Sequence, residues 1–522
     1  MLENRQAETA GPELAAGQRE QTRPGPAGPA RAGRWRDGRA GARTMTGAVA
    51  RRHWPALILL AAGLVLRVAA ELAYRPALFF VDSVRYLYNA EGMDPVGYKA
   101  PLRALLFIGN FDTVTAVQHL LGLAMAVVVY LLLIRRGVNR WLAALAIAPV
   151  LLDAYQVQIE QMIMPDVWFE ALIVAGLAIL LWRPAPGWRR VVAAGIVLGT
   201  SATVAQVGEA LVLPAVIYLL AAGGGWRQAV GKAAAMCAAF ALPIVAYCSG
   251  SYALTGDFFL SHSGVTSLYG RLAAAADCTT LKLPSGERGM CPTAAEAARG
   301  PDWLEYNDGS PIRPYYSNLP RGEVDSMISD FNHRVLSQQP LQVAGAYARD
   351  VVKLFALTRD GQGGDTPIAR WQFQTTYTYY PPWTSQAVVR TATSHFGGGA
   401  PAVWRPAASF LRSYQMDGGY TPGPLMLILA AAGLIGSVVA VVRRRLDPGT
   451  RGLALGCLMF FAAGAFVTLV SDWFEFSWRY QLPALVTLVP AGVLGLSVLI
   501  RSLRPARHDD RDIMDSGTPG RG

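Results

Sequence analysis

The sequence predicts an all-α, polytopic membrane protein, and its composition and charge distribution support this fold class. Of the 522 residues, 52% are hydrophobic and only 16% are charged, whereas soluble domains carry about 25% charged residues. The charges are concentrated in the N-terminal tail, in one long polar segment and in short connections. Apolar blocks of about 20 residues lie between them, which is the length a helix needs to cross a bilayer.

Ten apolar segments are counted as membrane spans. Their expected bounds are 54–74, 113–134, 141–156, 166–183, 189–205, 208–223, 230–249, 423–442, 452–470 and 481–500. The break between the fifth and sixth segments, at Gln206 to Glu209, is the weakest of the connections. We therefore expect these two segments to be short or broken helices.

Arginine and lysine cluster in alternate connections, and this predicts the orientation. The clusters are Arg51-Arg52, Arg135-Arg136 with Arg140, Arg183 with Arg189-Arg190, Arg227 with Lys232, Arg443-Arg444-Arg445 with Arg451, and Arg501 with Arg504 and Arg507. With ten spans, all of them share one side with both termini. Basic residues are enriched on the cytoplasmic side, so both termini are predicted to be cytoplasmic in the cell membrane, and the remaining connections extracytoplasmic.

This topology divides the chain into regions. Residues 1–48 are rich in Gly, Ala, Pro and Arg and cannot form a core, so we expect a disordered cytoplasmic tail; Met45 offers an alternative start to Met1. The other expected regions are a transmembrane core at 49–249 with its first outer loop at 75–112, an extracytoplasmic loop domain at 250–422 between spans seven and eight, C-terminal transmembrane helices at 423–500, and a disordered cytoplasmic tail at 501–522.

The long polar segment, residues 250–422, contains two of the five cysteines. Cys278 and Cys291 could form a disulfide if the segment is outside the cell, and both the bridged and the free state remain open. The aromatic run that begins at Trp371 and ends at Trp383 has two interpretations. It could form a membrane-interface belt or a wall on which a sugar stacks.

The first outer loop is the first candidate functional stretch. Its polar side chains are Asp82, Arg85, Tyr86, Tyr88, Glu91, Asp94, Tyr98, Lys99 and Arg103. Asp82 lies between Phe80, Val81 and Val84, so we expect it to be only partly hydrated. Partial burial raises a carboxyl pKa and favours general-base chemistry. The alternative is that Asp82 caps the N-terminus of a short helix.

The second outer turn places acidic residues at the start of the fourth span. Pro165 is suited to the start of a helix, and Asp166 and Glu170 are four residues apart, so they share one helical face. The helix dipole alone could account for Asp166. Glu170 lies deeper and needs a partner or a water-filled cavity, and Glu160 precedes both.

The last outer turn carries an arginine between two aromatic residues. Arg479, flanked by Trp478 and Tyr480, is suited to bind a phosphate, because a guanidinium can bind two phosphate oxygens and stays charged. Snorkelling to the membrane surface is the alternative. Arg67 and Glu71, four apart in the first span, are predicted to form an internal ion pair.

Three motifs together resemble the GT-C glycosyltransferases, which take sugars from polyprenyl-phosphate carriers, and in particular the protein O-mannosyltransferases and the lipid A aminoarabinose transferases. The motifs are Val81-Asp82-Ser83-Val84-Arg85-Tyr86-Leu87, Glu160 with Pro165-Asp166, and Arg479-Tyr480-Gln481-Leu482-Pro483. With the helical core they cover about half of the chain. O-mannosyltransferases often have an Asp-Glu pair in the first loop. Ser83 follows Asp82 here, which argues against a protein acceptor.

The resemblance implies an inverting hexosyl- or pentosyltransferase that acts by direct displacement at the extracytoplasmic face. The implied site residues are Asp82 and Asp166 for catalysis, Arg479, Tyr480, Lys99 and Arg103 for the phosphate of the lipid carrier, and Arg85, Tyr86, Glu160 and Glu170 for the substrate. A divalent cation shared by Asp82 and Asp166 remains open, and no other cofactor is implied. The acceptor is a cell-wall glycan, a glycolipid or a protein, and nucleic acid is not a partner.

Two other functions stay open from the sequence. One is a lipid or polysaccharide transporter or flippase, which would place ionisable residues near the bilayer midplane and show internal repeats. The other is a non-catalytic membrane assembly protein that uses the long polar segment for binding. The enzyme interpretation requires Asp82, Asp166 and Arg479 to meet at one site.

Overall fold

The computed structural model describes residues 34–88, 95–222, 225–361, 363–443 and 446–503. The chain forms two compact units, residues 1–52 and 53–522, and all ten predicted spans and all the candidate site residues belong to the second unit. Several residues of the predicted loops, clusters and tails lie outside the described part of the chain: Glu91, Asp94, Arg444, Arg445, Arg504 and Arg507, and most of the tails predicted at 1–48 and 501–522.

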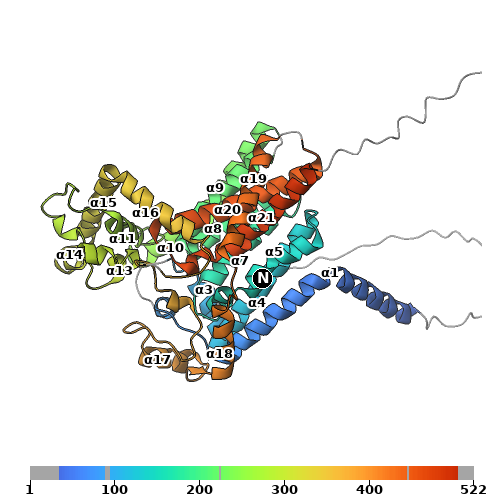
Figure 1. The fold of residues 1–522 in the computed structure, drawn as a ribbon, viewed down its shortest axis with the longest axis horizontal. Helices are drawn as coiled ribbons and strands as arrows, with labels where there is room; N and C mark the ends of the chain where they lie inside the picture. The colour runs from blue at the N-terminus through green and yellow to red at the C-terminus, as the bar shows by residue number, and fades with distance from the viewer. Residues whose placement is uncertain (1–33, 89–94, 223–224, 362, 444–445, 504–522) are drawn as a thin grey trace, which may run out of the picture. The chain divides into compact units, whose positions relative to one another are not determined.

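Helices occur at every predicted span (Figure 1). They are α1 (Arg34–Ala73), α4 (Phe111–Arg135), α5 (Arg140–Leu152) with α6 (Ala154–Glu160), α7 (Asp166–Leu181), α8 (Trp188–Val204), η1 (Gln206–Leu211) with α9 (Val212–Ala221), α10 (Trp226–Thr255), α19 (Gly423–Val442), α20 (Pro448–Phe474) and α21 (Pro483–Ser502). The sixth predicted span is broken, as expected, because η1 is a 3-10 turn ahead of the short helix α9. α8 is a single continuous helix and, with 17 residues, a short one, which also agrees with that expectation.

Among the described residues, six helices are long and apolar enough to cross a membrane. They are Arg51–Ala73, Phe111–Arg135, Trp226–Thr255, Gly423–Val442, Pro448–Phe474 and Trp478–Ser502. α5 and α6 would add a seventh, although they are bent by 54° at their junction. The protein is thus a multi-pass helical membrane protein. About ten spans were predicted; α7, with 16 residues, and α8, with 17, are not among these six or seven, and they lie at the short end of the about 17 to 25 residues that a transmembrane helix takes.

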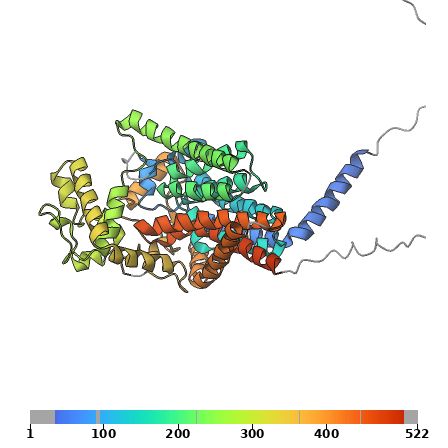
Figure 2. The same cartoon turned by 90° about the horizontal axis from the view of Figure 1, so that it is seen from above.

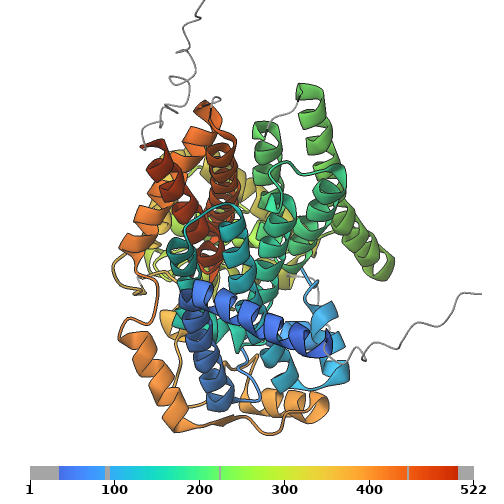
Figure 3. The ribbon, with the colours of Figure 1, turned by 90° about the vertical axis from the view of Figure 1, so that its right-hand side faces the viewer.

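The last three helices pack closely through small residues. A Cβ atom added at Gly495 of α21 would lie 2.0 Å from the carbonyl oxygen of Ala432 on α19, and one at Gly492 would lie 2.6 Å from Leu429. Only glycine permits this approach, which is how membrane helices gain van der Waals contact. In Figure 3, α19 to α21 form one group of ribbons in red and orange, and α8 to α10 form another in green.

The long polar segment contributes to two hydrophobic cores. α11 (Gly264–Ala275), α13 (Pro301–Tyr306) and α15 (Arg321–Gln338) enclose a small core with Tyr269, Leu304 and Phe331. The remaining elements between α10 and α19 are η2 (Arg288–Met290), α12 (Ala294–Ala297), α14 (Arg313–Asn318), α16 (Pro340–Lys353), η3 (Ile368–Trp371), α17 (Gln386–Phe396), β2 (Ala402–Val403) and α18 (Arg405–Met416). Figure 2 shows α11 and α13 to α16 grouped beyond the ends of the long helices.

The second half of the long polar segment belongs to the main core instead. Trp371, Phe373 and Leu411 are buried there with the membrane helices. β2 pairs antiparallel with β1 (Tyr74–Arg75), directly after α1. Residues 250–422 are therefore one insertion with two packing environments. The structure also joins Cys278 to Cys291 by a disulfide, one of the two states that the sequence left open.

The break between α5 and α6 anchors the long polar segment. Asp153 caps α6 by accepting from the Tyr155 amide at 3.1 Å, and it also accepts from the Thr421 amide at 2.8 Å. Its carboxylate binds both terminal nitrogens of Arg359, at 3.2 and 2.7 Å. The Arg359 guanidinium lies 4.5 to 5.4 Å from the rings of Tyr155, Tyr420 and Trp478, so its charge is enclosed on several sides.

A buried polar cluster joins α1, α4 and α6. Arg67 donates to the carbonyl oxygens of Leu151 and Val150 at 2.9 and 3.0 Å, and to Glu160 Oε1 at 2.7 Å. His119 Nδ1 lies 2.9 Å from the other Glu160 oxygen. The predicted pairing of Arg67 with Glu71 is therefore wrong: the Arg67 side chain turns toward the end of α5 and the α6 carboxylate. Glu71 instead lies 4.0 Å from His119 Nε2.

Glu160→Gln should destabilise the protein strongly, because it leaves the buried Arg67 guanidinium without its counter-charge. Removing one partner of a buried ion pair costs about 3 to 5 kcal/mol. The measurement is equilibrium unfolding of the purified protein in detergent. Adding Arg67→Met to Glu160→Gln should restore most of the lost stability. Glu71→Gln serves as the control and should cost less; equal losses for the two single variants would contradict this assignment.

Candidate functional site

Three distant stretches of chain meet at the Arg479 guanidinium. Arg479 lies on η4 (Trp478–Gln481), immediately before α21. Its Nε donates to Asp166 Oδ1 at 2.7 Å, and its Nη1 donates to Asp82 Oδ2 at 3.1 Å. We call these residues the carboxylate–arginine triad. The convergence that the enzyme interpretation required is present, and the triad is mostly but not fully buried, with side-chain exposures of 9 to 20%.

Backbone pairing explains why the two carboxylates lie together. The Leu78 amide donates to the Gln161 carbonyl at 2.9 Å, and the Ile163 amide donates to the Leu78 carbonyl at 3.0 Å. This pairing fixes the chain just before Asp82 against the turn just before Asp166. Asp82 immediately precedes α2 (Ser83–Leu87), but its side chain makes no cap hydrogen bond, so the capping alternative is not supported.

The turn between α20 and α21 carries Arg479 and is clamped by the long polar segment. The Trp478 indole donates to the Asp360 carbonyl at 3.2 Å. Thr366 donates to the Glu475 carboxylate, and Lys353 lies 5.0 Å from the Phe476 ring. Residues from 353 onward therefore hold the arginine-bearing turn, so the long polar segment takes part in shaping the site.

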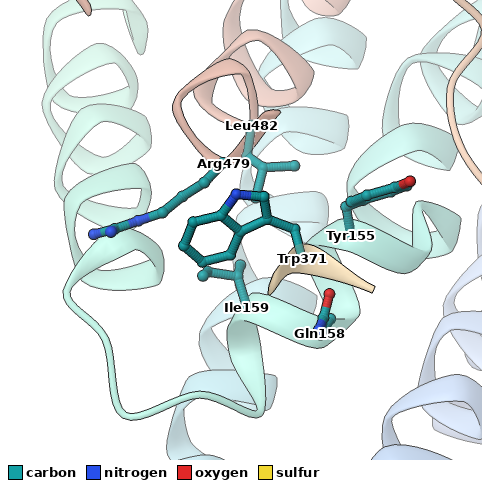
Figure 4. A pocket seen from close by; sticks show the side chains of 6 residues that line it. All are labelled: Tyr155, Gln158, Ile159, Trp371, Arg479 and Leu482. Carbon is teal, nitrogen blue, oxygen red and sulfur yellow. The ribbon is translucent and has the colours of Figure 1, made fainter. Parts of the chain in front are cut away.

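Aromatic rings flank the arginine. The Arg479 guanidinium carbon lies 5.6 Å from the Trp371 ring centre and 5.4 Å from that of Tyr480. Figure 4 shows the Trp371 indole lying between Arg479 and Ile159 in a narrow pocket. The pocket is lined by Tyr155, Gln158, Ile159, Trp371, Arg479 and Leu482. Trp371 is thus a buried wall of the site rather than part of an exposed membrane-interface belt.

One terminal nitrogen of Arg479 remains available. Within the described part of the chain, Nε and Nη1 are occupied by the two carboxylates, whereas Nη2 makes no hydrogen bond. Arg85 adds a second positive charge, with Nη1 3.7 Å from Asp82 Oδ1. Two guanidinium and two carboxylate groups leave the cluster near neutrality, so an incoming phosphate would not face a net negative charge.

The other predicted loop residues lie around the triad without joining it. Tyr86 is buried against Tyr98, with ring centres 5.2 Å apart. Arg103, on α3 (Lys99–Ile108), donates to the Leu87 carbonyl and lies over the Phe396 ring. It therefore braces the loop. Burial and the nearby Arg103 charge lower the pKa of the Lys99 amine.

Glu160 and Glu170 do not fit the predicted substrate-binding role. Both side chains are fully buried. Both Glu160 oxygens are engaged by Arg67 and His119. Glu170 Oε2 accepts from Gln156 at 2.8 Å, which supplies the partner that its depth required. Neither carboxylate is open to a substrate in this structure, and Glu170 Oε1 makes no hydrogen bond.

The sequence analysis did not identify the ion pair of Asp302 and Arg370, which lies beside the site. Arg370 lies 3.3 Å from Asp302, and the Arg370 guanidinium is 5.9 Å from the Phe80 ring. Burial and, to a smaller extent, the nearby Asp302 carboxylate raise the pKa of the Glu475 carboxyl to about 8. The aromatic run that begins at Trp371, directly after Arg370, could have pointed to this region. Asp302 is too far from Arg370 in the sequence for residue spacing to predict that the two are close in space.

No cluster of three or more His, Cys, Asp or Glu side chains suited to a metal ion occurs among the residues that the structure describes. The position between Asp82 and Asp166 is bridged by the Arg479 guanidinium. A divalent cation shared by those two carboxylates stays a prediction.

A comparison with protein families gives one match. The model of the dolichyl-phosphate-mannose-protein mannosyltransferase family matches residues 105–243. This stretch contains Asp166 but neither Asp82 nor Arg479. No protein of curated function matches the chain.

Two solved structures are similar to this chain at low sequence identity. The protein O-mannosyltransferase Pmt1-Pmt2 complex of S. cerevisiae, bound to its sugar donor, matches 45% of this chain at 18% identity and a TM-score of 0.31. The archaeal oligosaccharyltransferase AglB from Archaeoglobus fulgidus, in complex with an inhibitory peptide and a dolichol-phosphate, matches 87% at 13% identity and a TM-score of 0.40. The matches span 37% and 51% of those two chains. The family match confirms, over residues 105–243, the predicted resemblance to the protein O-mannosyltransferases.

Proposed function

We propose that this protein is a membrane glycosyltransferase that moves a sugar from a polyprenyl-phosphate carrier to an acceptor hydroxyl at the extracytoplasmic face. The observation that carries the proposal is the carboxylate–arginine triad. In the triad, Asp82 is the acid–base group and Arg479 is the phosphate-binding group. The two are hydrogen-bonded to each other, and Nη2 of Arg479 is still free to donate. The family match over residues 105–243 supports the same class of reaction.

The proposed reaction is one direct displacement. The acceptor oxygen bonds to C1 of the sugar while the bond from C1 to the phosphate oxygen breaks. Asp82 takes the acceptor proton as general base. The leaving phosphate gains negative charge, which Arg479 stabilises as the charge develops. A single displacement inverts the configuration at C1.

The triad suggests how Asp82 becomes available as a base. Its Oδ2 accepts from Arg479 at 3.1 Å, so this oxygen is already engaged before any substrate binds. A phosphate bound to Arg479 competes for the same guanidinium and would free Asp82, while the shorter bond to Asp166, 2.7 Å, keeps the arginine in place. Asp166 is thus proposed as the residue that orients Arg479. Lys99 is proposed to assist in binding the phosphate.

The acceptor and the sugar follow less directly from the site. A hexose or pentose is proposed as the sugar, and a cell-wall glycan, glycolipid or protein as the acceptor. A transporter would instead need ionisable groups along a pathway through the bundle. The meeting of Asp82, Asp166 and Arg479 at the ends of helices favours the enzyme. The basic clusters in alternate connections support an extracytoplasmic site.

Asp82→Asn should lower sugar transfer about 100- to 10,000-fold, because the amide cannot accept the acceptor proton. Transfer is measured with membranes or purified protein and a polyprenyl-phosphate sugar donor. Asp308→Asn, which makes the same change at an exposed position of the long polar segment, should leave transfer unchanged. Unaltered activity in a correctly folded Asp82→Asn variant would remove Asp82 as the base.

Arg479→Lys should raise the KM for the lipid-linked donor and lower kcat, because an ammonium cannot bridge two carboxylates and bind a phosphate in the planar geometry of a guanidinium. We expect a fall in kcat/KM on the order of 100-fold. Arg67→Lys is the control, since Arg67 is also a buried, ion-paired arginine but pairs with Glu160 in the helix core. It should reduce stability but not donor KM, and equal donor effects in the two variants would contradict the assignment.

A further inference from the structure

A side-chain hydrogen bond joins the two ends of the loop that carries Arg479. Asp472 lies in the last turn of α20, and Gln481 is the last residue of η4, just before α21. Asp472 Oδ1 accepts from Gln481 Nε2 at 2.7 Å. The bond therefore closes the loop at its base, where the chain leaves one membrane helix and enters the next.

The Asp472–Gln481 pair is shielded from solvent. The exposed fractions of the two residues are 0% and 4%. The other oxygen of Asp472 and the amide oxygen of Gln481 make no hydrogen bond within the part of the chain that the structure describes. The bond at 2.7 Å therefore fixes the Gln481 side chain, and a hydrogen bond to a carboxylate is among the stronger ones in proteins.

Gln481 lies on the opposite side of the turn from the carboxylate–arginine triad. A 3-10 turn has about three residues per turn, so side chains two residues apart point about 120° away from each other. Arg479 reaches toward Asp82 and Asp166, whereas Gln481 reaches back to α20. The Asp472–Gln481 pair thus fixes the backbone that carries Arg479 without touching the triad.

Arg271 holds the α20 side of this pair. It lies on α11, is 4% exposed, and donates from Nη2 to the Asp472 carbonyl at 2.9 Å. The same guanidinium pairs with Asp350 of α16. Carbonyl groups in the last turn of a helix have no partner within the helix, and a positive charge there is favoured by the helix dipole. The end of α20 is therefore fixed by the long polar segment.

The neighbouring residue joins the end of α20 to the small core of α11, α13 and α15. Trp473 packs against that core, and its ring centre lies 5.4 Å from that of Tyr347. The Tyr347 hydroxyl donates to the Leu469 carbonyl at 3.0 Å. The position of Asp472 is thus set by α11 and α16, and Gln481 passes this constraint to the loop.

We propose that Asp472 and Gln481 are positioning residues that hold Arg479 where it can bind the phosphate of the donor. The inference rests on the proposed function. Arg479 must keep Nε on Asp166 while Nη2 faces the phosphate, and a misplacement of about 1 Å at such a site can lower the rate about 100-fold. Contacts from Trp478 and Thr366 hold the outer part of the loop, and the Asp472–Gln481 pair holds its base.

Gln481→Met tests the proposal, because it removes the amide donor and keeps a side chain of similar length. Gln339→Met is the matched control: Gln339 is also 4% exposed, and it bonds to both the amide and the carbonyl of Asp277 at 2.8 Å. Transfer from a polyprenyl-phosphate sugar donor and the melting temperature are measured. Gln481→Met should raise the donor KM about tenfold and lower kcat less. Gln339→Met should lower the melting temperature and leave the donor KM unchanged.

A double variant separates positioning from stability. Asp472→Leu with Gln481→Met removes both partners, so no buried polar group loses its partner and stability changes little. The donor KM should still rise about tenfold. Loss of the Asp472 charge would by itself favour an anionic donor, so a raised KM cannot come from the charge. Asp472→Asn keeps an acceptor oxygen and should raise the KM less than Asp472→Leu.

The Arg479→Lys background shows whether Gln481 acts through Arg479. There, Gln481→Met should change the donor KM little, because both changes affect the same group. Full multiplication of the two KM effects would overturn the proposal. Should the double variant fail to fold, Gln481→Met against Gln339→Met decides, and equal donor KM values in these two would also overturn it.

The outcomes distinguish this proposal from the proposed function. If the folded double variant keeps the wild-type donor KM while Arg479→Lys raises it, the positioning role is wrong and the proposed function stands. If Arg479→Lys leaves the donor KM unchanged as well, Arg479 is not the phosphate-binding group, and the positioning proposal fails together with that assignment.

Discussion

The site depends on the ion pairs of Arg479, because a buried guanidinium without counter-charges would be strongly destabilising. Arg479 sits where the chain enters its last membrane helix and is largely removed from water, so its charge requires carboxylate partners nearby. Asp82 and Asp166 meet that requirement from two other parts of the chain. The same requirement constrains the backbone, since the turn before α7 must pair with the chain before α2 to bring both carboxylates within reach. Charge pairing therefore couples the ends of several helices at one point.

The long polar segment also contacts the region around Arg479. Its contacts to the turn before α21 involve an indole, a threonine and a lysine, and it supplies Trp371 beside Arg479. A second anchor is formed by Asp153 and Arg359 at the bend between α5 and α6. Because the stretch from 353 to 371 touches both places, the position of Arg479 depends on residues far from it in the chain. The segment is thus a structural part of the proposed site, while its helices α11 to α15 pack mainly around their own core.

The polar clusters differ in what they can do. Both Glu160 oxygens and one Glu170 oxygen are hydrogen-bonded and both side chains are closed to solvent, whereas the carboxylate–arginine triad keeps partial contact with solvent and a free donor. Both kinds of cluster contain carboxylates and an arginine, so residue type alone does not separate them. Exposure to solvent does.

The sequence by itself determined the helical membrane class, the positions of the helices and the three stretches that carry Asp82, Asp166 and Arg479. These follow from local properties: runs of apolar residues, charge at their ends, and short polar motifs. Only the tertiary structure decided that Arg67 pairs with Glu160 rather than Glu71, that Glu160 and Glu170 are closed to solvent, and that Trp371 and Arg359 belong to the site region. From helical spacing alone, the expected partner of a charged side chain is the opposite charge four residues away in the same helix. A long side chain in a low-dielectric core instead turns to whichever carboxylate and carbonyl groups the packing brings within about 3 Å, and that choice depends on contacts between residues separated by tens to hundreds of positions in the chain.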